Sequence, residues 1–470
     1  MFEQLNEIIK KIDGFVWGLP LIIFILAVGI YLTIRLNVLQ IIHLPKALKF
    51  MVKNEEGGTG EVTSFGALCT ALSATIGTGN IVGVATALVA GGPGALFWMW
   101  IAAFFGMATK YSEGLLAIKY RNIDAEGHVL GGPFYYIENG MGKNWKWLAK
   151  LFAFFGTAAG LFGIGTFTQV NGITSAAKNF FDANNAVTVN LFGQNYSWAV
   201  IISGLIVTIC AALVIVGGLK RIVSVSEIVV PFMVIVYVGV CLIILIGNYK
   251  AVPSALAEVF ESAFGLRAVA GGALGAVIVA MQKGIARGIF SNESGLGSAP
   301  IAAAAAKTNE PARQGLVSMT GTFIDTIIVC TMTGLSIVIT GSWNVGLDGV
   351  EVTTRAFQKG LPFNPAVSSF ILMMCLVFFA FTTIIGWSYY SERCLEYLSH
   401  GKQKPVMIYR WLYILAVFIG PYMTVQAVWN ISDIFNGMMA FPNLIALCAL
   451  SGVVIKESRD YFKRMRHELD

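Results

Sequence analysis

Long apolar runs separated by short polar loops recur along the whole chain. Many of these runs contain roughly 20 residues, the length that an α-helix needs to cross a bilayer. The pattern therefore predicts an all-α, polytopic membrane protein with about eleven transmembrane helices. The expected spans are 14–38, 64–91, 93–121, 145–176, 197–217, 224–247, 255–289, 315–341, 364–399, 404–420 and 424–452.

An odd number of spans suggests one extra helix followed by two sets of five. Because each set crosses the membrane an odd number of times, the two sets must be inverted relative to each other, an arrangement common among transporters. The expected parts are an N-terminal lead-in (1–13), an extra transmembrane helix (14–38), a first five-helix repeat (64–247), a second repeat (255–452) and a basic tail (453–470).

The second span contains a break of its own. Gly77 and Gly79 lie near its middle, among the polar residues Thr75, Thr78 and Asn80. An interior glycine costs a helix about 1 kcal/mol relative to alanine, and backbone groups freed inside a bilayer need partners. A discontinuous helix here offers N–H groups to an anion and C=O groups to a cation. The alternative is that small residues only allow close packing of a neighbouring helix.

An inverted repeat predicts a matching break in the seventh span. Gly271, Gly272 and Gly275 lie about as far into that span as Gly77 and Gly79 lie into the second. This coincidence favours discontinuous helices over simple close packing, with the two breaks forming one binding site near the middle of the membrane.

Further polar and aromatic residues are candidates for lining that site. Thr166 and Gln169 share one face of the unusually polar fourth span, and Phe167 would supply an apolar wall. Trp387 in the ninth span is a candidate lid. Ordinary interhelical hydrogen bonds would equally explain the polar residues, and an interfacial anchor would explain the tryptophan.

Asp325 lies about ten residues into the eighth span. A carboxylate inside a membrane is costly and is a functional hypothesis by default. It would complete a second cation site with Asn80 or carry a proton. The alternative is a hydrogen-bonded structural group facing Thr322 or Thr326.

Composition supports this class and excludes others. The chain is 56% hydrophobic and only 12% charged, whereas soluble domains average about 25% charged. The seven cysteines show no CxxC spacing, and no HExxH, P-loop or nucleophile elbow occurs, so neither a metal site nor an enzyme is indicated. The net charge of +6 needs no nucleic-acid partner, since Lys and Arg gather in alternate loops beside the membrane lipid. Their bias predicts an outside N-terminus and a cytoplasmic C-terminus in the cell membrane.

Three motifs together resemble the alanine or glycine:cation symporter family, within the amino acid–polyamine–organocation superfamily. They are Gly77-Thr-Gly-Asn80, Ala270-Gly-Gly-Ala-Leu-Gly-Ala276 and the long run from Arg287 to Pro300. The resemblance implies the LeuT-type five-plus-five fold, alanine or glycine as substrate, and Na⁺ as coupling ion without an organic cofactor. It also implies a sodium site formed by Ser73, Ile76, Thr382 and Thr383. Since adjacent threonines point in different directions on a helix, one hydroxyl would alternatively bond only its own backbone.

The expected function is secondary active import of a small neutral amino acid, coupled to Na⁺ by alternating access. The substrate would lie at the unwound second and seventh helices. The rival hypotheses are a H⁺-coupled transporter and an uncoupled amino-acid facilitator or channel.

Overall fold

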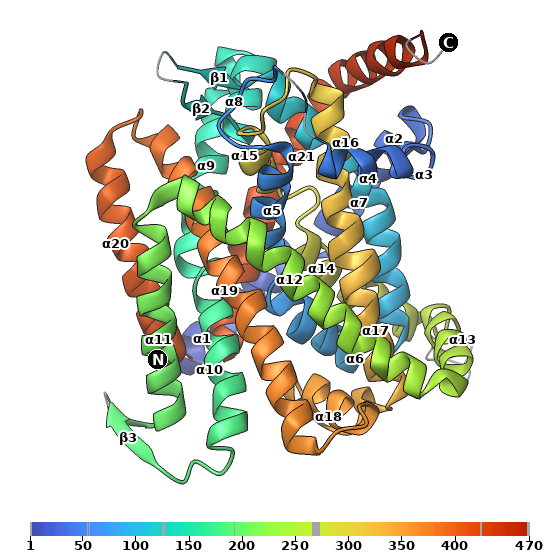
Figure 1. Cartoon of the computed structure of the whole chain (residues 1–470), viewed down its shortest axis with the longest axis vertical. Helices are drawn as coiled ribbons and strands as arrows, with labels where there is room; N and C mark the ends of the chain where they lie inside the picture. The colour runs from blue at the N-terminus through green and yellow to red at the C-terminus, as the bar shows by residue number, and fades with distance from the viewer. Residues whose placement is uncertain are drawn as a thin grey trace.

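The computed structural model describes residues 2–53, 55, 57–124, 127–191, 193–265, 273–423 and 425–467. Its architecture is a helical bundle with two small hairpins (Figure 1). The elements before the first expected repeat are α1 (Phe2–Val16), α2 (Leu19–Arg35), α3 (Leu39–Ile42) and α4 (Leu44–Val52).

The first half of the bundle contains an interrupted helix, a long helix and a second interrupted helix. Its elements are α5 (Ser64–Thr75), η1 (Gly79–Gly83), α6 (Val84–Gly91), α7 (Gly94–Lys119), β1 (Asn122–Ile123), β2 (Val129–Leu130), α8 (Pro133–Tyr135), η2 (Tyr136–Met141), η3 (Lys143–Trp145), α9 (Lys146–Phe162), α10 (Phe167–Phe181), β3 (Thr188–Leu191), β4 (Gln194–Ser197), α11 (Trp198–Ile215) and α12 (Gly218–Gly247). Strands β1 and β2 pair antiparallel, as do β3 and β4.

The second half again begins with short helical pieces and continues with long helices. Its elements are η4 (Tyr249–Ala251), α13 (Val252–Ala263), α14 (Ala273–Asn292), α15 (Ala299–Ala303), α16 (Pro311–Thr322), η5 (Phe323–Cys330), α17 (Thr331–Ile339), η6 (Ser342–Asn344), α18 (Val350–Gly360), α19 (Pro365–Leu398), α20 (Gln403–Ile419), η7 (Gly420–Tyr422) and α21 (Val425–His467). Helix α21 continues through most of the segment expected as a separate basic tail.

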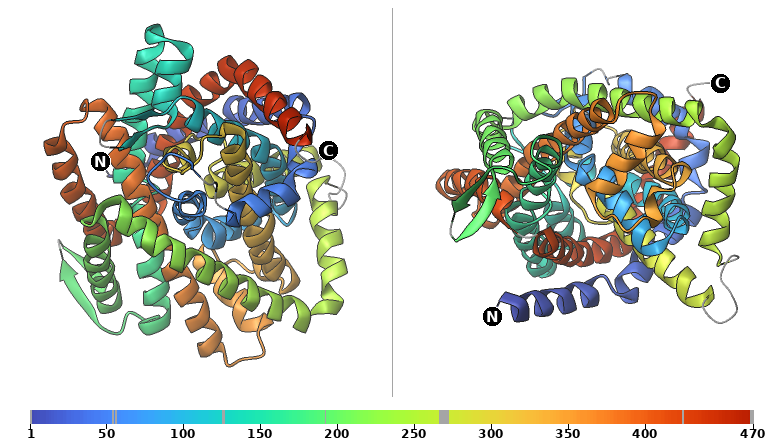
Figure 2. Two further views of the ribbon diagram at one scale, coloured as in Figure 1. Left: turned by 45° about the horizontal axis from the view of Figure 1, so that its top comes forward. Right: turned by 90° about the horizontal axis from the view of Figure 1, so that it is seen from below.

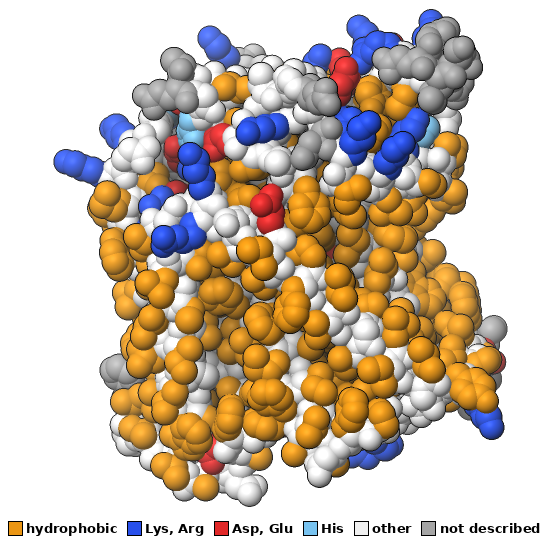
Figure 3. Space-filling model, viewed as in Figure 1, with side chains coloured by type: hydrophobic (Ala, Val, Ile, Leu, Met, Phe, Trp, Pro, Cys, Tyr) orange, Lys and Arg blue, Asp and Glu red, His pale blue; other side chains and the backbone are white. Residues whose placement is uncertain are grey.

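Eight helices in the described residues are long and apolar enough to cross a membrane, and nine if the bent pair α5 and η1–α6 counts as one span. The expected number of about eleven stays a prediction. Hydrophobic side chains cover the middle of the molecule, while Lys and Arg gather at one end (Figure 3). We call this end, formed by α4, the β1–β2 hairpin, the α15–α16 loop and the end of α21, the basic end.

Glycines allow the central helices to approach closely. Helix α7 packs most extensively against α16 and α14. A Cβ atom on Gly315 of α16 would lie 2.6 Å from the Tyr111 carbonyl oxygen of α7, so only glycine fits there. Small residues at such contacts are typical of helix packing in membranes. Helix α1, in contrast, lies across the outside of the bundle against α21 (Figure 2).

Candidate functional site

The first interruption lies between α5 and η1, as the glycine pattern predicts. Helix α5 ends at Thr75, Ile76 is extended, and a π-helix begins at Gly79. The axis bends by 53° across this break. A Cβ atom on Gly77 would clash with Thr383 Oγ1 and lie 2.8 Å from Gln169 Oε1, so the break needs glycine here. The expected discontinuous helix is confirmed.

Side chains from α10, from α19 and from the break itself take up the backbone groups freed by this break. Gly77 N–H donates to Asn80 Oδ1 (2.9 Å), and Thr78 N–H donates to Gln169 Oε1 of α10 (3.0 Å). Thr383 Oγ1 of α19 donates to the Ile76 carbonyl oxygen (3.2 Å). The Gly79 N–H opens the π-helix, where helix geometry offers it no partner within its own helix. The break is therefore bonded to α10 and α19 together.

The second interruption lies between α14 and α15. Glu293, Gly295 and Gly297 all have positive φ angles, of 56°, 88° and 80°. Lys110 Nζ of α7 donates to the Asn292 carbonyl oxygen (2.9 Å), which ends α14. Glu113 Oε1, one turn further along α7, accepts the N–H groups of Gly295 (3.1 Å) and Gly297 (3.2 Å). A cation at the helix C-terminus and an acceptor for freed N–H groups stabilise this break.

The position of the second break corrects the sequence-based prediction. Gly271 and Gly272 lie outside the described residues. Gly275 lies in the first turn of α14, is exposed, and has open space where a Cβ atom would be. It therefore does not line the break, which begins after Asn292. The partners that allow the chain to unwind there belong to α7, so a glycine-rich stretch alone does not locate it.

Asp325 joins the two breaks. It lies in the π-helix η5 and is fully buried. Its Oδ1 accepts the Asn80 side-chain amide from the first break (2.7 Å), and its Oδ2 accepts the hydroxyl of Ser291, just before the second break (2.8 Å). Thr326 Oγ1 also donates to Oδ2 (2.7 Å). The two breaks approach so closely that a Cβ atom on Gly79 would lie 3.4 Å from Ser291 Cα.

The two adjacent threonines of α19 point in different directions. Thr383 reaches Ile76 at the break, whereas Thr382 Oγ1 donates to its own helix at Phe379 O (2.9 Å) and faces Met233 of α12. The structure therefore does not bring Thr382 to the α5 break. Ser73 lies on α5 where α19 comes close, because a Cβ atom on Gly386 would lie 2.7 Å from Ser73 Oγ. The Ser73 hydroxyl itself donates to Thr70 O (2.8 Å).

The other predicted residues divide between the site and its surroundings. Gln169 contacts the first break, and Trp387 Nε1 donates to Glu293 Oε1 at the second (2.7 Å). The Thr166 and Thr75 hydroxyls donate to backbone oxygens of the same chain segment, Leu161 O and Ala71 O. Phe167 packs in a separate apolar cluster with Ala416 and Val428. The structure therefore does not place Phe167 at either break.

Several polar residues of the site were not among the predicted ones. They are Glu113 and Glu293, described above, with Ser432, Asn436 and Asn443 on one face of α21. Asn443 donates to Glu113 Oε1 (2.6 Å) and to the Gly295 carbonyl oxygen (2.9 Å). Asn436 is fully buried, yet neither its amide nitrogen nor its oxygen bonds to any of the described residues. A buried amide without partners is costly, which marks this face as a place for a polar ligand or water.

An ion pair lies close to the second break, on its side away from the basic end. The Arg287 guanidinium of α14 makes two bonds with the Asp433 carboxylate of α21, at 3.1 and 2.8 Å. It also lies over the Trp429 ring, with its central carbon 4.9 Å from the ring centroid. Bidentate pairs of this kind are strong and directional. They hold α14 against α21 on that side of the two breaks.

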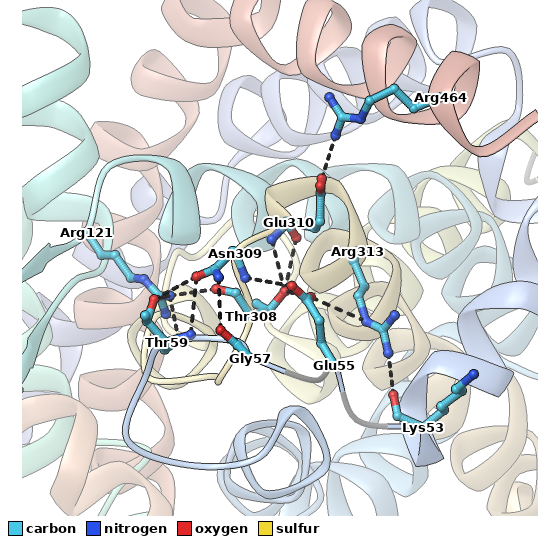
Figure 4. A network of polar contacts seen from close by, with 10 residues as sticks. All are labelled: Lys53, Glu55, Gly57, Thr59, Arg121, Thr308, Asn309, Glu310, Arg313 and Arg464. Atoms are coloured by element: carbon cyan, nitrogen blue, oxygen red, sulfur yellow. Dashed lines mark hydrogen bonds and ion pairs between the residues drawn. The ribbon is translucent and has the colours of Figure 1, made fainter. Parts of the chain in front are cut away.

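A backbone strap closes the basic end. Residues 59–62, which lead into α5, bond to residues 305–308, which follow α15, through a parallel bridge between Val62 and Ala306. Arg121 donates to four carbonyl oxygens on both strands, those of Thr59, Ala304, Ala306 and Thr308, at 2.5 to 2.8 Å. Figure 4 shows this arginine reaching both segments, with Glu55 and Asn309 adding further bonds. The halves of both broken helices at this end are thus tied together.

A histidine adds a charged contact beside the strap. His128 Nδ1 lies 2.9 Å from Glu61 Oε1, and its Nε2 lies 3.6 Å from Glu396 Oε1 at the end of α19. Hydrogen bonds to Glu396 and Glu61 raise the pKa of His128 to about 9. Burial and the neighbouring Arg393 guanidinium, which contacts His128 Nε2, act against this rise in pKa.

The fold is similar to that of a solved transporter. The crystal structure of MhsT in complex with L-phenylalanine matches with a TM-score of 0.56 and 14% sequence identity, covering 86% of this chain and 99% of that one. This protein is therefore an all-α, multi-pass membrane protein with the LeuT-type fold.

Sequence comparisons narrow the class to a family. The model of the sodium:alanine symporter family matches residues 2–470. An uncharacterized transporter of Haemophilus influenzae is 53% identical over 98% of this chain and 97% of its own length. The sodium/alanine symporter AgcS of Methanococcus maripaludis is 45% identical over 98% of each chain. The chain belongs to the sodium:alanine symporter family, whose members are transporters and not enzymes.

Replacing Gly77 with alanine tests whether the first break needs its present geometry. The added methyl group would collide with Thr383 and Gln169, so we expect substrate binding to fall at least ten-fold while the protein stays in the membrane. The matched control is Gly83→Ala at the end of the same π-helix, where the nearest atom lies 3.9 Å away. Binding of radiolabelled alanine to purified protein measures both. Equal affinities for the two variants would contradict the assignment.

Proposed function

We propose that this transporter imports a small neutral amino acid, alanine or glycine, together with Na⁺ by alternating access. The observation that carries the proposal is the Asp325 carboxylate, which bonds to Asn80 at one helix break and to Ser291 at the other. A cation there would hold both breaks in one arrangement and so favour substrate binding between them. The relative AgcS is named a sodium/alanine symporter, which supports the choice of ion and substrate.

The substrate's two charged ends find complementary groups at the two breaks. The N–H of Gly79 begins a helical segment, where helix polarity favours a carboxylate. The Thr78 hydroxyl beside it is buried, has no hydrogen-bond partner among the described residues, and supplies a further donor. The buried Glu293 carboxylate at the second break is suited to the ammonium group, with Trp387 bonded to it as a wall. The crowding around Gly77 and Gly79, where an added Cβ atom would meet neighbouring helices, favours a substrate with a small side chain.

Oxygen atoms gather at two places suited to Na⁺, a hard cation that prefers several oxygen ligands. The first comprises the Ile76 carbonyl oxygen and the Thr383 hydroxyl, between α5 and α19, with Ser73 close by. The second comprises Asp325, Asn80 and Ser291. Each place connects a broken helix to a neighbouring long helix. Sodium binding therefore changes the relative stability of the arrangements that the breaks adopt.

Coupling follows because ligand and ion share the same backbone segments. If Na⁺ raises the affinity for the amino acid, the amino acid raises the affinity for Na⁺ by the same factor. Alternating access then requires the Arg287–Asp433 pair and the Arg121 strap to open in turn. The excess of Lys and Arg at the basic end supports a cytoplasmic location for that end by the positive-inside rule. The strap is accordingly the inner closure, and the ion pair is the outer one.

Uptake into proteoliposomes tests the proposed function directly. With an inward Na⁺ gradient and equal pH on both sides, we expect alanine to accumulate above its external concentration. Replacing Na⁺ with choline should reduce the initial rate at least ten-fold. Uptake that follows a pH gradient without Na⁺ would establish H⁺ coupling instead. Uptake that never exceeds equilibrium under any gradient would establish a facilitator.

The threonine pair of α19 offers a matched test of the first sodium site. Thr383→Ala removes a hydroxyl at Ile76, and we expect the Na⁺ concentration for half-maximal uptake to rise about ten-fold, since such a bond to a charged group contributes about 1.5 kcal/mol. Thr382→Ala removes a hydroxyl that bonds within its own helix and should leave that concentration within about two-fold. Equal effects of the two substitutions would contradict a sodium site at Ile76.

A further inference from the structure

A groove at the basic end, outside the transport pathway, has no role in the function described so far. It lies between the turn that follows α2 and the last part of α21, and its volume is about 570 Å³. Arg35, Arg459 and Lys463 line it as cations, while Leu36, Ile455 and Phe462 supply an apolar floor. A cationic rim over an apolar floor is suited to an anionic amphiphile.

The sequence of the α2–α3 turn shapes one wall of this groove. Asn37 N–H donates to Ile34 O and Val38 N–H to Thr33 O, so two carbonyls in the last turn of α2 are bonded within the turn. Asn37 and Val38 are both left-handed, with φ angles of 55° and 54°. The chain therefore turns back toward α21, where His43 stacks on Phe462 with the ring centroids 4.0 Å apart.

The three cations of the groove lack anionic partners among the described residues. Arg35 contacts only the Tyr31 hydroxyl (3.4 Å) and ring, and no carboxylate of the described chain lies within 4.0 Å of Arg459 or Lys463. Neighbouring cations of the same end do have such partners, as in the pairs Lys119–Glu457 and Arg464–Glu310, both at 2.7 Å. An external anion would therefore gain three charge contacts without displacing any internal one.

Exposed apolar side chains lie beside the cationic rim of the groove. Ile34, Ile41 and Ile42 flank it, and their exposed fractions are 66%, 62% and 61%. Ile42 also forms part of the groove wall. Isoleucines exposed to this extent beside a membrane-spanning helix are suited to acyl chains, whereas the adjacent cations are suited to phosphate at headgroup depth.

We propose that this groove binds the headgroup of an anionic phospholipid from the cytoplasmic leaflet. The phosphate lies among Arg35, Arg459 and Lys463, and an acyl chain runs along Ile34 and Ile42. The bound lipid connects α2 to the end of α21, the helix whose other end carries Asp433 of the outer closure. The leaflet assignment rests on the orientation proposed above, whereas binding itself does not depend on the transported substrate.

Native mass spectrometry of the full-length protein from nanodiscs tests this proposal. The probe is phosphatidylglycerol titrated into phosphatidylcholine. The groove variant is R35Q/R459Q/K463Q, and the matched control is K220Q/K402Q/K404Q, which removes three exposed lysines from the same end outside the groove. Each cation contributes about five-fold to binding, so the groove variant should bind phosphatidylglycerol about 100-fold more weakly than wild type. The control should bind it within about three-fold of wild type.

Three outcomes overturn the proposal. The first is that the groove variant retains phosphatidylglycerol as well as wild type does, and the second is that the control variant loses it equally. The third is that inorganic phosphate at equal concentration displaces the lipid, which would indicate a site for soluble phosphate. If the triple variant does not fold, the single variants R459Q and K463Q should each show the five-fold loss, and their wild-type retention would contradict the assignment. Alanine uptake in phosphatidylcholine alone distinguishes this result from a failure of the transport proposal.

Discussion

A membrane helix can be interrupted only where other groups take up the backbone N–H and C=O groups that the interruption frees. Both interruptions in this protein meet that requirement with side chains from elsewhere in the bundle. Gln169 and Thr383 bond to the first break. Lys110 and Glu113 bond to the second. The position of α7, α10 and α19 around the two breaks follows from this requirement, and so does the polarity of those helices near their middle.

The same bonds explain how a small solute and an ion can be coupled. The groups that stabilise the breaks are oxygens and amides that also suit a cation or a zwitterion, so binding and backbone arrangement are inseparable. Asp325 is central because its two oxygens contact both breaks. The two closures involve the same broken helices as the site. Arg287 belongs to α14, and Arg121 bonds to the segments next to α5 and α15. Under the proposed function, a change at the site would reach both closures through these shared elements.

The sequence predicts the class, the fold and the first break because their signals are local. The lengths of the apolar runs indicate membrane-spanning helices, and Gly77 and Gly79 indicate an interruption in the helix that contains them. Asp325 stands out as a carboxylate within an apolar run. A break was expected near Gly271–Gly275, where Gly271 and Gly272 lie outside the described residues and Gly275 lies within α14. The interruption that the described residues show follows Asn292, where Lys110 and Glu113, distant in sequence, bond to the freed backbone groups. Thr382 and Thr383 point in different directions, and Phe167 is buried away from the site. Both depend on how each helix is rotated about its axis, which a single sequence does not reveal.

A structure determined by crystallography with alanine and Na⁺ bound tests the central claim most directly. The account predicts the alanine carboxylate within hydrogen-bonding distance of the backbone between Gly77 and Asn80, its ammonium group near Glu293, and sodium coordinated by Asp325 or by Ile76 and Thr383. Thallium, used as an anomalous substitute for sodium, would locate the ion independently. Alanine bound away from both breaks, or continuous helices through residues 73–83 and 290–299, would contradict the account.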